Sequence, residues 1–336
     1  MVNQKIKLTR PGLFLPSFYC EENLESKVIV RPTILSICAA DQRYFKGLRS
    51  PDVLKEKLPM CLIHEAIGRV IEDPLKRIPS GQNVILLPNG GNNKETQNYS
   101  THSFFRSSNS DGFTQEVLGV EFEEILPFHS PFPKYYVLAE IISVCYHAIS
   151  QIPLEEWERI NRVGIWGDGI VSYLLSLCIK REYPGIHVSI FGKHEEKLIL
   201  FSHTDSVQIV YRNKTFISPV EMAFEAVGGG KAGEAINQII EAVAPRSYVC
   251  LTGVSEELVP ISTRRILEKG LTLRGTSRSL RKDFIKAKGL LDSLCDFSVL
   301  DKIISKEIVI HSSEDLTQAF YQDQKVPFKT FLDWKI

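Results

Sequence analysis

Side chains that bind transition metals occur at several points in the first 140 residues. Cys38 is followed by Asp41, the neighbours His64 and Glu65 come 26 residues after the cysteine, and Glu140 stands further along. A thiolate, an imidazole and one or two carboxylates form a set that suits zinc and leaves a coordination position open for catalysis. A cysteine and a histidine at this spacing also occur without any metal, so the residues alone leave both interpretations open.

A glycine-containing turn suggests a second kind of chemistry, the binding of a pyrophosphate. Gly167 and Gly169 lie between a predicted strand and a predicted helix that begins at Ile170. Gly167 would permit a tight turn, and Gly169 would let backbone amides approach a pyrophosphate at the positive end of the helix. The third glycine of this dinucleotide fingerprint is replaced by Ser172, which is also small. An ordinary tight turn is the alternative interpretation.

The end of the next predicted strand bears on the choice of nucleotide. An NAD site has Asp or Glu there to bind the ribose 2′-hydroxyl, whereas this chain has Gly192 followed by Lys193. The missing carboxylate removes repulsion of a 2′-phosphate, and the lysine attracts it. The pattern favours NADPH, although Lys193 could be a solvated loop lysine. We also assign Gly253, which follows the predicted strand 247–252, to the cofactor site.

The patterns of predicted strands and helices differ between two parts of the chain. They predict two kinds of domain, which would position the metal-binding side chains and the glycine turn. The first 150 residues contain short β-branched segments separated by turns, which indicates an irregular β domain. Strands are predicted at 27–36, 66–71 and 83–87, and a long polar surface loop at 89–109. Pro32 interrupts the first of these strands, which indicates either an edge strand or a bend.

From about residue 150, strands alternate with helices, a pattern typical of a parallel sheet with right-handed crossovers. Strands are predicted at 162–166, 187–191, 206–210, 222–227 and 247–252, and helices at 153–159, 170–180, 195–202 and 232–244. A strand at 308–311 and a helix at 313–321 then suggest a return to the first domain. We predict an α/β fold with a β-rich catalytic domain over 1–150, a doubly wound Rossmann domain over 151–285, and a C-terminal return over 286–336.

Composition excludes several classes of protein. The chain has 336 residues, 43% hydrophobic and 24% charged, and its 40 basic residues balance its 40 acidic ones. A balanced charge argues against nucleic-acid and anionic-membrane partners, and no apolar stretch approaches the roughly 18 residues of a membrane span. The N-terminus lacks the apolar segment of a signal peptide. Seven scattered cysteines suit a reducing compartment, so we expect a cytoplasmic protein.

Several motifs resemble one superfamily in order and over nearly the whole chain. They are Cys38-x-x-Asp41, His64-Glu65 before Gly68-Arg69-Val70, Asp111-Gly112-Phe113, the glycine turn at 167–169, and Phe224-Glu225-Ala226-Val227-Gly228-Gly229. Together they resemble the zinc-dependent medium-chain dehydrogenases. The resemblance implies a GroES-like catalytic domain beside a Rossmann domain that binds the nicotinamide cofactor.

The polyol branch of that superfamily, sorbitol dehydrogenase and its relatives, is most similar. The resemblance implies one catalytic zinc ion with the ligands Cys38, His64, Glu65 and Glu140, the last binding directly or through the zinc water. Tyr44 matches an aromatic residue of the substrate pocket. The alternative is that Tyr44 is a residue of the hydrophobic core. Arg278 matches an arginine that reaches the substrate and the carboxylates.

Two departures from the relatives matter. Many relatives hold a second, structural zinc with four closely spaced cysteines, but this chain has no cysteine between Pro88 and Asp111. We therefore expect no structural zinc. Relatives also often have Ser or Thr two residues after the zinc cysteine as a proton relay, and here that residue is Ala40.

Basic residues after Cys38 bear on the substrate. Arg43, Lys46 and Arg49 form a cluster, and we assign Arg43 and Lys46 to a substrate phosphate that charge-assisted hydrogen bonds would hold. A solvated basic loop is the alternative. The chain as a whole is similar to the ribulose-5-phosphate reductases, also called ribitol-5-phosphate dehydrogenases. This resemblance implies reduction of D-ribulose 5-phosphate by NADPH to D-ribitol 5-phosphate, which supplies CDP-ribitol for teichoic acid or capsule synthesis.

Two other functions stay open. One is an NAD-dependent dehydrogenase of another polyol or polyol phosphate, such as sorbitol or galactitol 1-phosphate. The other is a non-catalytic protein that senses the nucleotide, although the four metal-binding side chains argue against it. Relatives suggest a homodimer formed through the cofactor domain. A CDP-ribitol-forming cytidylyltransferase would be a natural pathway partner.

Overall fold

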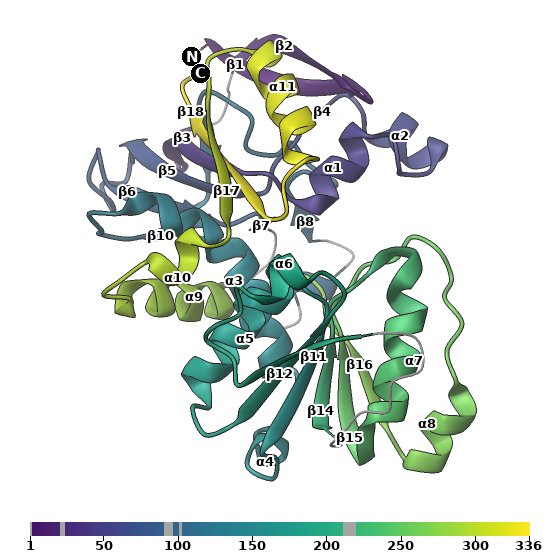
Figure 1. Cartoon of the computed structure of the whole chain (residues 1–336). Coiled ribbons are helices and arrows are strands. Elements are labelled where there is room, and N and C mark those ends of the chain that lie inside the picture. The colour runs from purple at the N-terminus through teal and green to yellow at the C-terminus, as the bar shows by residue number, and fades with distance from the viewer. Residues whose placement is uncertain (1, 21–23, 91–96, 101–102, 211–219) are drawn as a thin grey trace. The chain divides into compact units, whose positions relative to one another are not determined.

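The computed structural model describes residues 2–20, 24–90, 97–100, 103–210 and 220–336. The chain divides into two compact units (Figure 1). The terminal unit combines Met1–Ser143 with Ser279–Ile336, and the central unit is Val144–Arg278. The sequence placed the corresponding borders after residues 150 and 285. We describe each unit by itself.

Three sheets form the terminal unit. The largest has the order β10 (Ile125–Pro127), β6 (Asn83–Leu86), β5 (Glu65–Glu72), β3 (Val28–Ser36), β18 (Lys329–Trp334) and β17 (Ile304–Ile310), with β9 (Leu118–Val120) also paired to β3. The second has the order β2 (Leu13–Cys20), β1 (Val2–Arg10) and β4 (Met60–Cys61), and the third pairs β7 (Asn89–Gly90) with β8 (Phe104–Phe105). Because β7 and β8 fall inside 89–109, that segment is not wholly a loop; its residues 91–96 and 101–102 lie outside the described residues.

The C-terminal strand completes the sheet that the first half of the chain begins. β18 runs antiparallel to β3, and Leu332 lies opposite Leu35 with both side chains fully buried. β3 is therefore a central strand, and the edge-strand alternative is wrong. The bend alternative fits, because the pairing of β3 with β5 shifts register between Pro32 and Ile34. The proline lacks an N–H, so a bulge there avoids a missing hydrogen bond in the ladder.

Helices surround these sheets. They are α1 (Ala39–Phe45), α2 (Pro51–Lys57), η1 (Gln97–Tyr99), η2 (Phe122–Glu124), η3 (Pro133–Leu138), the start of α3 (Ala139–Ser150), α9 (Arg281–Ser293), α10 (Ser298–Asp301) and α11 (Ser313–Asp323). Phe45 of α1 packs on Phe14 of β2 and Phe320 of α11, with ring centroids 5.7 and 4.9 Å apart. This apolar contact fixes α1, which carries residues of the predicted site, to the sheet.

The central unit confirms the predicted α/β fold. Six parallel strands have the order β13 (Ser206–Ile209), β12 (His187–Gly192), β11 (Arg162–Trp166), β14 (Val220–Glu225), β15 (Val243–Leu251) and β16 (Thr272–Gly275). Its helices are the end of α3, α4 (Leu154–Trp157), α5 (Ile170–Glu182), α6 (Glu195–Leu198), η4 (Gly229–Lys231), α7 (Ala232–Ala242) and α8 (Thr263–Lys269). The sequence analysis did not predict β16 or α8, and its predicted helix at 195–202 extends four residues beyond the end of α6.

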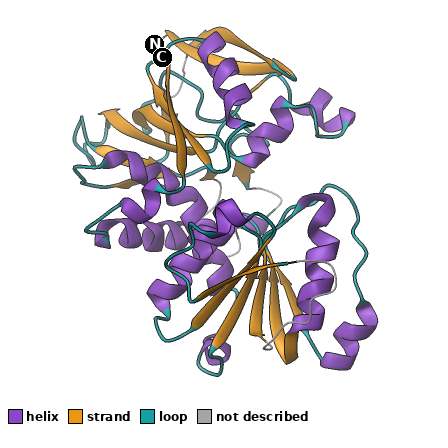
Figure 2. Ribbon diagram, in the orientation of Figure 1, coloured by secondary structure: helices purple, strands orange, loops and turns teal. Residues whose placement is uncertain are grey.

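The strand order reverses between β11 and β14, which is where ligands bind in doubly wound sheets. After β11 the chain moves outward to β12 and β13, and after β13 it crosses to β14 and moves the other way. Right-handed crossovers then place α5 on one face of the sheet and α7 with α8 on the other (Figures 1 and 2). Trp166 and Phe191 stack within the core at the end of neighbouring strands, with ring centroids 4.0 Å apart.

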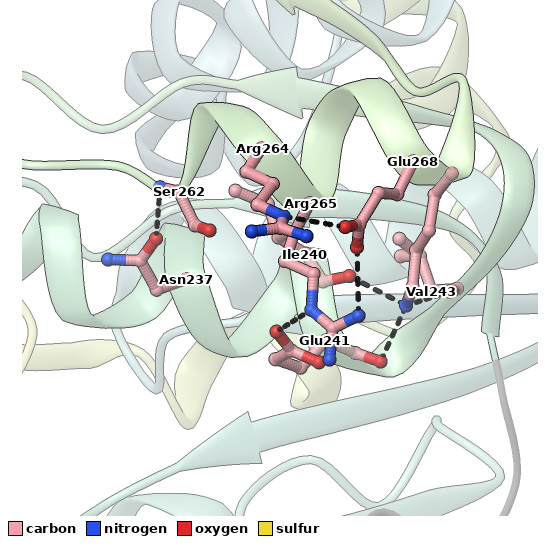
Figure 3. A network of polar contacts seen from close by, with 9 residues as sticks. Asn237, Ile240, Glu241, Val243, Ser262, Arg264, Arg265 and Glu268 are labelled. Carbon is pink, nitrogen blue, oxygen red and sulfur yellow. Dashed lines mark hydrogen bonds and ion pairs between the residues drawn. The ribbon is translucent and has the colours of Figure 1, made fainter.

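Polar contacts join α8 to the end of α7 (Figure 3). Lys269 donates hydrogen bonds from Nζ to the carbonyl oxygens of Ile240, Glu241 and Val243 at 2.8, 2.8 and 2.9 Å. These carbonyl groups lie at the C-terminus of a helix, where intrahelical partners run out and a cation is favourable. Arg265 adds ion pairs to Glu241 and to a carboxylate of its own helix. In both units, no helix of the described residues is long and apolar enough to cross a membrane.

Candidate functional site

Three of the predicted metal ligands lie together in the terminal unit. One ligand atom each of Cys38, His64 and Glu65 lies within 4.8 Å of the others. The pairing of β3 with β5 brings this about, because it sets Ser36 opposite Glu65. Cys38 follows β3 by two residues and His64 precedes β5, so both lie at the same end of the two strands. The histidine and the carboxylate are buried and the thiol is half-buried.

Asp41 holds the histidine from behind. Its fully buried carboxylate accepts hydrogen bonds from the backbone N–H of Cys38 at 3.1 Å and of Ile63 at 3.0 Å, and from the hydroxyl of Ser107 at 2.5 Å. The Nδ1 atom of His64 lies 3.5 Å from the same carboxylate. A carboxylate on one ring nitrogen leaves the other nitrogen to face a metal ion, an arrangement common in metal sites. The contact is an ion-pair contact, because Nδ1 has no hydrogen-bond partner among the described residues, and we infer that it orients the ring of His64.

The charges of this pair reinforce each other. Burial alone would raise the pKa of Asp41, but the attraction of His64 and the hydrogen bonds from Ser107 and Ile63 leave it lowered. Burial alone would lower the pKa of His64, but the attraction of Asp41 and Cys38 raises it well above its usual value. A site that attracts a proton this strongly also attracts a metal cation, so the proton and the metal ion compete for His64.

A buried lysine balances the acidic side chains. Lys329 of β18 contacts the Oε1 atom of Glu65 and donates to the carbonyl oxygen of Ile37 at 3.2 Å. Burial disfavours the lysine charge, but Glu65 and Cys38 outweigh this and raise its pKa. The other oxygen of Glu65, Oε2, is buried and has no hydrogen-bond partner among the described residues. An unpartnered carboxylate oxygen beside a thiol and an imidazole suits a zinc ion.

Glu140 lies near this group but outside it. It is the second residue of α3 and is buried, yet its oxygens are not among the atoms within 4.8 Å of one another. Burial raises the pKa of Glu140 to about 7, with His64 opposing the rise and Glu65 adding to it. The four predicted ligands thus divide into a close set of three and a neighbouring carboxyl group.

The predicted substrate residues lie on and after α1. Tyr44 is buried and belongs to the core cluster of the terminal unit. The guanidinium group of Arg49 lies over its ring, 4.9 Å from the centroid. Arg43 is half-buried on the helix, and Lys46, at its end, is exposed. Arg49, which we did not assign to the site, thus makes a cation–π contact with Tyr44 that the sequence analysis did not predict.

The glycine turn lies in a cavity of about 340 Å³ within the central unit. Four of the six predicted cofactor residues line it, namely Gly167, Gly169, Gly192 and Lys193. The other two, Ile170 and Gly253, are not among its lining residues. Ile170 begins α5, so the N-terminus of that helix follows the turn directly. No side chain of the described residues caps this helix start, and backbone N–H groups at a helix N-terminus favour an anion.

Close packing at the turn requires glycine. Gly167 has a φ of +128°, and a Cβ atom there would lie 2.8 Å from the carbonyl oxygen of Ala226. A Cβ atom on Gly192 would lie 2.7 Å from the Cβ atom of Asp168. Asp168 therefore occupies the space in which a longer residue at the end of β12 would stand. Arg278, the last residue of the central unit, has a φ of +60°.

The chain is similar to curated reductases from end to end. It is 37% identical to ribulose-5-phosphate reductase 2 of Staphylococcus aureus (strain NCTC 8325 / PS 47), and the alignment covers 100% of both chains. It is also 37% identical to the ribulose-5-phosphate reductase of Bacillus spizizenii (strain ATCC 23059 / NRRL B-14472 / W23), again over 100% of both. The chain belongs to the family of ribulose-5-phosphate reductases. The resemblance stated from its motifs is confirmed.

Solved structures agree with this family. The crystal structure of S. aureus TarJ in complex with NADPH has a TM-score of 0.87 and 34% sequence identity, and each chain is covered fully. L-idonate 5-dehydrogenase from Escherichia coli has a TM-score of 0.85 at 20% identity, covering 99% of this chain and 98% of that one, and supports the fold alone. No family model matches the chain.

The sequence analysis gave Asp41 a different role and did not identify Lys329. Asp41 was counted with the metal-binding side chains, but its role is to hold His64. Its place three residues after Cys38, at the start of a helix, is a signal that could have been used. Lys329 had no such signal, because it stands 264 residues from its partner Glu65 and only the return of β18 joins them.

Proposed function

We propose that this chain is a zinc-dependent reductase that converts D-ribulose 5-phosphate, NADPH and a proton into D-ribitol 5-phosphate and NADP⁺. One observation carries the proposal. A buried thiol, imidazole and carboxylate converge in a chain that matches ribulose-5-phosphate reductases over its full length. The NADPH complex of S. aureus TarJ supports the choice of cofactor.

Cys38, His64 and Glu65 would hold the zinc ion, with Glu140 binding it directly or through its water. When bound, zinc polarises the ketone oxygen as a Lewis acid, and the nicotinamide carries the hydride. Asp41 fixes the ring of His64 so that one nitrogen faces the ligand set. Lys329 compensates part of the negative charge of the thiolate and carboxylates, which would otherwise repel one another.

The terminal unit would be the catalytic domain, and the central unit the NADP-binding domain. Gly167, Gly169 and Ile170 would hold the pyrophosphate, and Gly192 and Lys193 the adenosine ribose, with Gly253 also assigned to the cofactor site. Their support is the cavity at the end of β11 and β12, where four of the six lie. Arg278 would reach the substrate and the carboxylates.

A phosphorylated substrate needs cations near the metal. We assign Arg43 and Lys46 to the phosphate and Tyr44 to the wall of the substrate pocket. Their support is the position of α1, whose N-cap residue is Cys38. A helix that starts at a metal ligand carries its following side chains into the neighbourhood of the metal.

We also propose an assembly and a cellular role. We propose a homodimer formed by the central unit, where β16 is an edge strand and Leu258 and Leu267 are 102% and 81% exposed. The edge strand and these two leucines are the surface that we assign to the interface. The product would supply CDP-ribitol for teichoic acid or capsule synthesis in the cytoplasm, with a cytidylyltransferase as the next enzyme. One zinc ion per chain is expected, because no cysteine cluster exists for a second.

The substrate assay compares phosphorylated with free ribulose. We expect oxidation of NADPH with D-ribulose 5-phosphate and at least about 100-fold lower kcat/KM with D-ribulose, since two charge-assisted contacts would be lost. Galactitol 1-phosphate with NAD⁺ is the competing reaction. Equal turnover of the two ribuloses would refute the phosphate assignment, and faster oxidation of galactitol 1-phosphate would refute the proposed substrate.

A further inference from the structure

Three lysines line the cavity of the central unit, Lys193, Lys197 and Lys231, and one carboxylate pairs with the first and the last of them. Lys193 lies on the turn after β12, and Lys231 lies in η4 just before α7. Glu234, in the first turn of α7, lies 3.4 Å from the Nζ atom of Lys193 through Oε1 and 3.6 Å from the Nζ atom of Lys231 through Oε2. All three residues line the cavity.

Asp168, the other carboxylate that lines the cavity, binds the backbone of the turn after β12. Asp168 accepts hydrogen bonds from the backbone N–H groups of Lys193 at 2.7 Å and His194 at 2.9 Å, and lies 3.0 Å from the Nδ1 atom of His194. Burial raises the pKa of Asp168, but these hydrogen bonds outweigh it and lower the pKa overall. Asp168 therefore fixes the turn that presents Lys193, and Glu234 is the carboxylate that a ligand could displace.

We propose that Lys193 and Lys231 together bind the 2′-phosphate of NADPH, and that Glu234 holds the two lysines until the phosphate displaces it. The proposal rests on the proposed use of NADPH. A phosphate carries up to two negative charges and three acceptor oxygens, so it satisfies two ammonium groups better than one carboxylate does. The lysine side chains are 47% and 66% exposed, so their pairs with Glu234 are weak and easily exchanged.

The same geometry gives Glu234 an opposite effect on the two nicotinamide cofactors. Its charge lies beside the lysines and repels a 2′-phosphate, whereas it would accept a hydrogen bond from the 2′-hydroxyl of NADH. Lys231 and Glu234 would therefore set the ratio of the affinities for NADPH and NADH from η4 and the first turn of α7. Neither residue supports the fold of the turn, because Asp168 does that.

Adenosine fragments test this without any sugar substrate. The affinities of the full chain for adenosine 2′,5′-bisphosphate and adenosine 5′-monophosphate, measured by calorimetry, differ by the 2′-phosphate alone. For Lys231→Ala we expect about tenfold weaker binding of the bisphosphate and less than about twofold change for the monophosphate. For Glu234→Gln we expect binding of the bisphosphate to tighten by about threefold or more while that of the monophosphate does not. The matched control is Arg159→Ala, which removes an exposed cation just after α4. It should change the affinity for neither adenosine fragment.

The affinities for the two adenosine fragments test separate claims. Monophosphate binding shows that a variant is folded. Equal losses for both fragments in Lys231→Ala, or no loss, would overturn the proposal, as would weaker bisphosphate binding by Glu234→Gln. A wild-type chain that binds the two fragments equally would instead refute the use of NADPH itself.

Discussion

The carboxylate of Asp41 is occupied by donors of the protein itself. Two backbone N–H groups and the Ser107 hydroxyl bind it, and His64 faces it at 3.5 Å. It cannot turn toward a metal ion without leaving these buried donors unpaired, at a cost of about 1–3 kcal/mol for each. Its effect on the site therefore passes through the orientation of His64.

Replacing Asp41 tests that role. Asp41→Asn should weaken zinc binding by about 10- to 100-fold, because the amide no longer attracts the His64 ring as a carboxylate does. The measurement is competition for zinc with a chromophoric chelator. Asp52→Asn, an exposed carboxyl group of α2, is the control and should bind zinc as the wild type does. Unchanged affinity in Asp41→Asn would show that the histidine is held by other contacts.

Asp73 gives a residue-scale prediction about pH. Its carboxylate, fully buried as a side chain, binds Arg77 and three backbone N–H groups, and the hydrogen bonds from Arg77 above all lower its pKa to about 2. The unfolded value is near 4. The stabilisation is therefore complete above about pH 4 and is lost as the pH falls from about 4 to 2.

Thermal unfolding measures this contribution. Asp73→Asn should lower the stability by about 1–2 kcal/mol at pH 6, and its difference from the wild type should shrink below pH 4. Glu72→Gln, the exposed neighbour, should show no such dependence. A difference that stays constant down to pH 2 would mean that the carboxylate charge contributes nothing.

At the scale of elements, the β3–β5 pair and the return of β18 assemble the site. Short β-branched segments predicted both first strands, and the alternation of strands and helices predicted the parallel sheet. The pattern could not show that β18 pairs with β3, because pairing partners far apart in the chain leave no local signal. The sequence analysis did not identify Lys329 for that reason, whereas the resemblance of their motifs to the medium-chain dehydrogenases had suggested Cys38 and Glu65 as ligands.

The helix pair of the central unit depends on one lysine. Lys269 of α8 binds three carbonyl groups at the end of α7. Lys269→Met should lower the free energy of unfolding by about 1–3 kcal/mol, because the methionine leaves those groups without their cation. Urea denaturation measures it, with Lys282→Met on α9 as an exposed control. If the two variants unfold with equal free energies, water replaces the hydrogen bonds of Lys269 without loss of stability.

At the scale of the whole molecule, the proposed dimer can be tested at the exposed leucines that we assign to its interface. Sedimentation should give two chains per particle, and Leu267→Glu should shift the mass toward one chain, because a charge would be buried at the interface. Leu154→Glu changes a leucine on α4 that is 61% exposed and should leave the dimer intact. A monomeric wild type would refute the dimer.

The most direct test of the account is the rate of NADPH oxidation by D-ribulose 5-phosphate before and after zinc is removed by a chelator and restored. The metal-free chain should lose at least about 100-fold in rate, since a Lewis acid supplies several kcal/mol of transition-state stabilisation. One equivalent of zinc should restore the rate in the wild type and fail to do so in Cys38→Ala. A chelated chain that keeps its full rate would contradict the account.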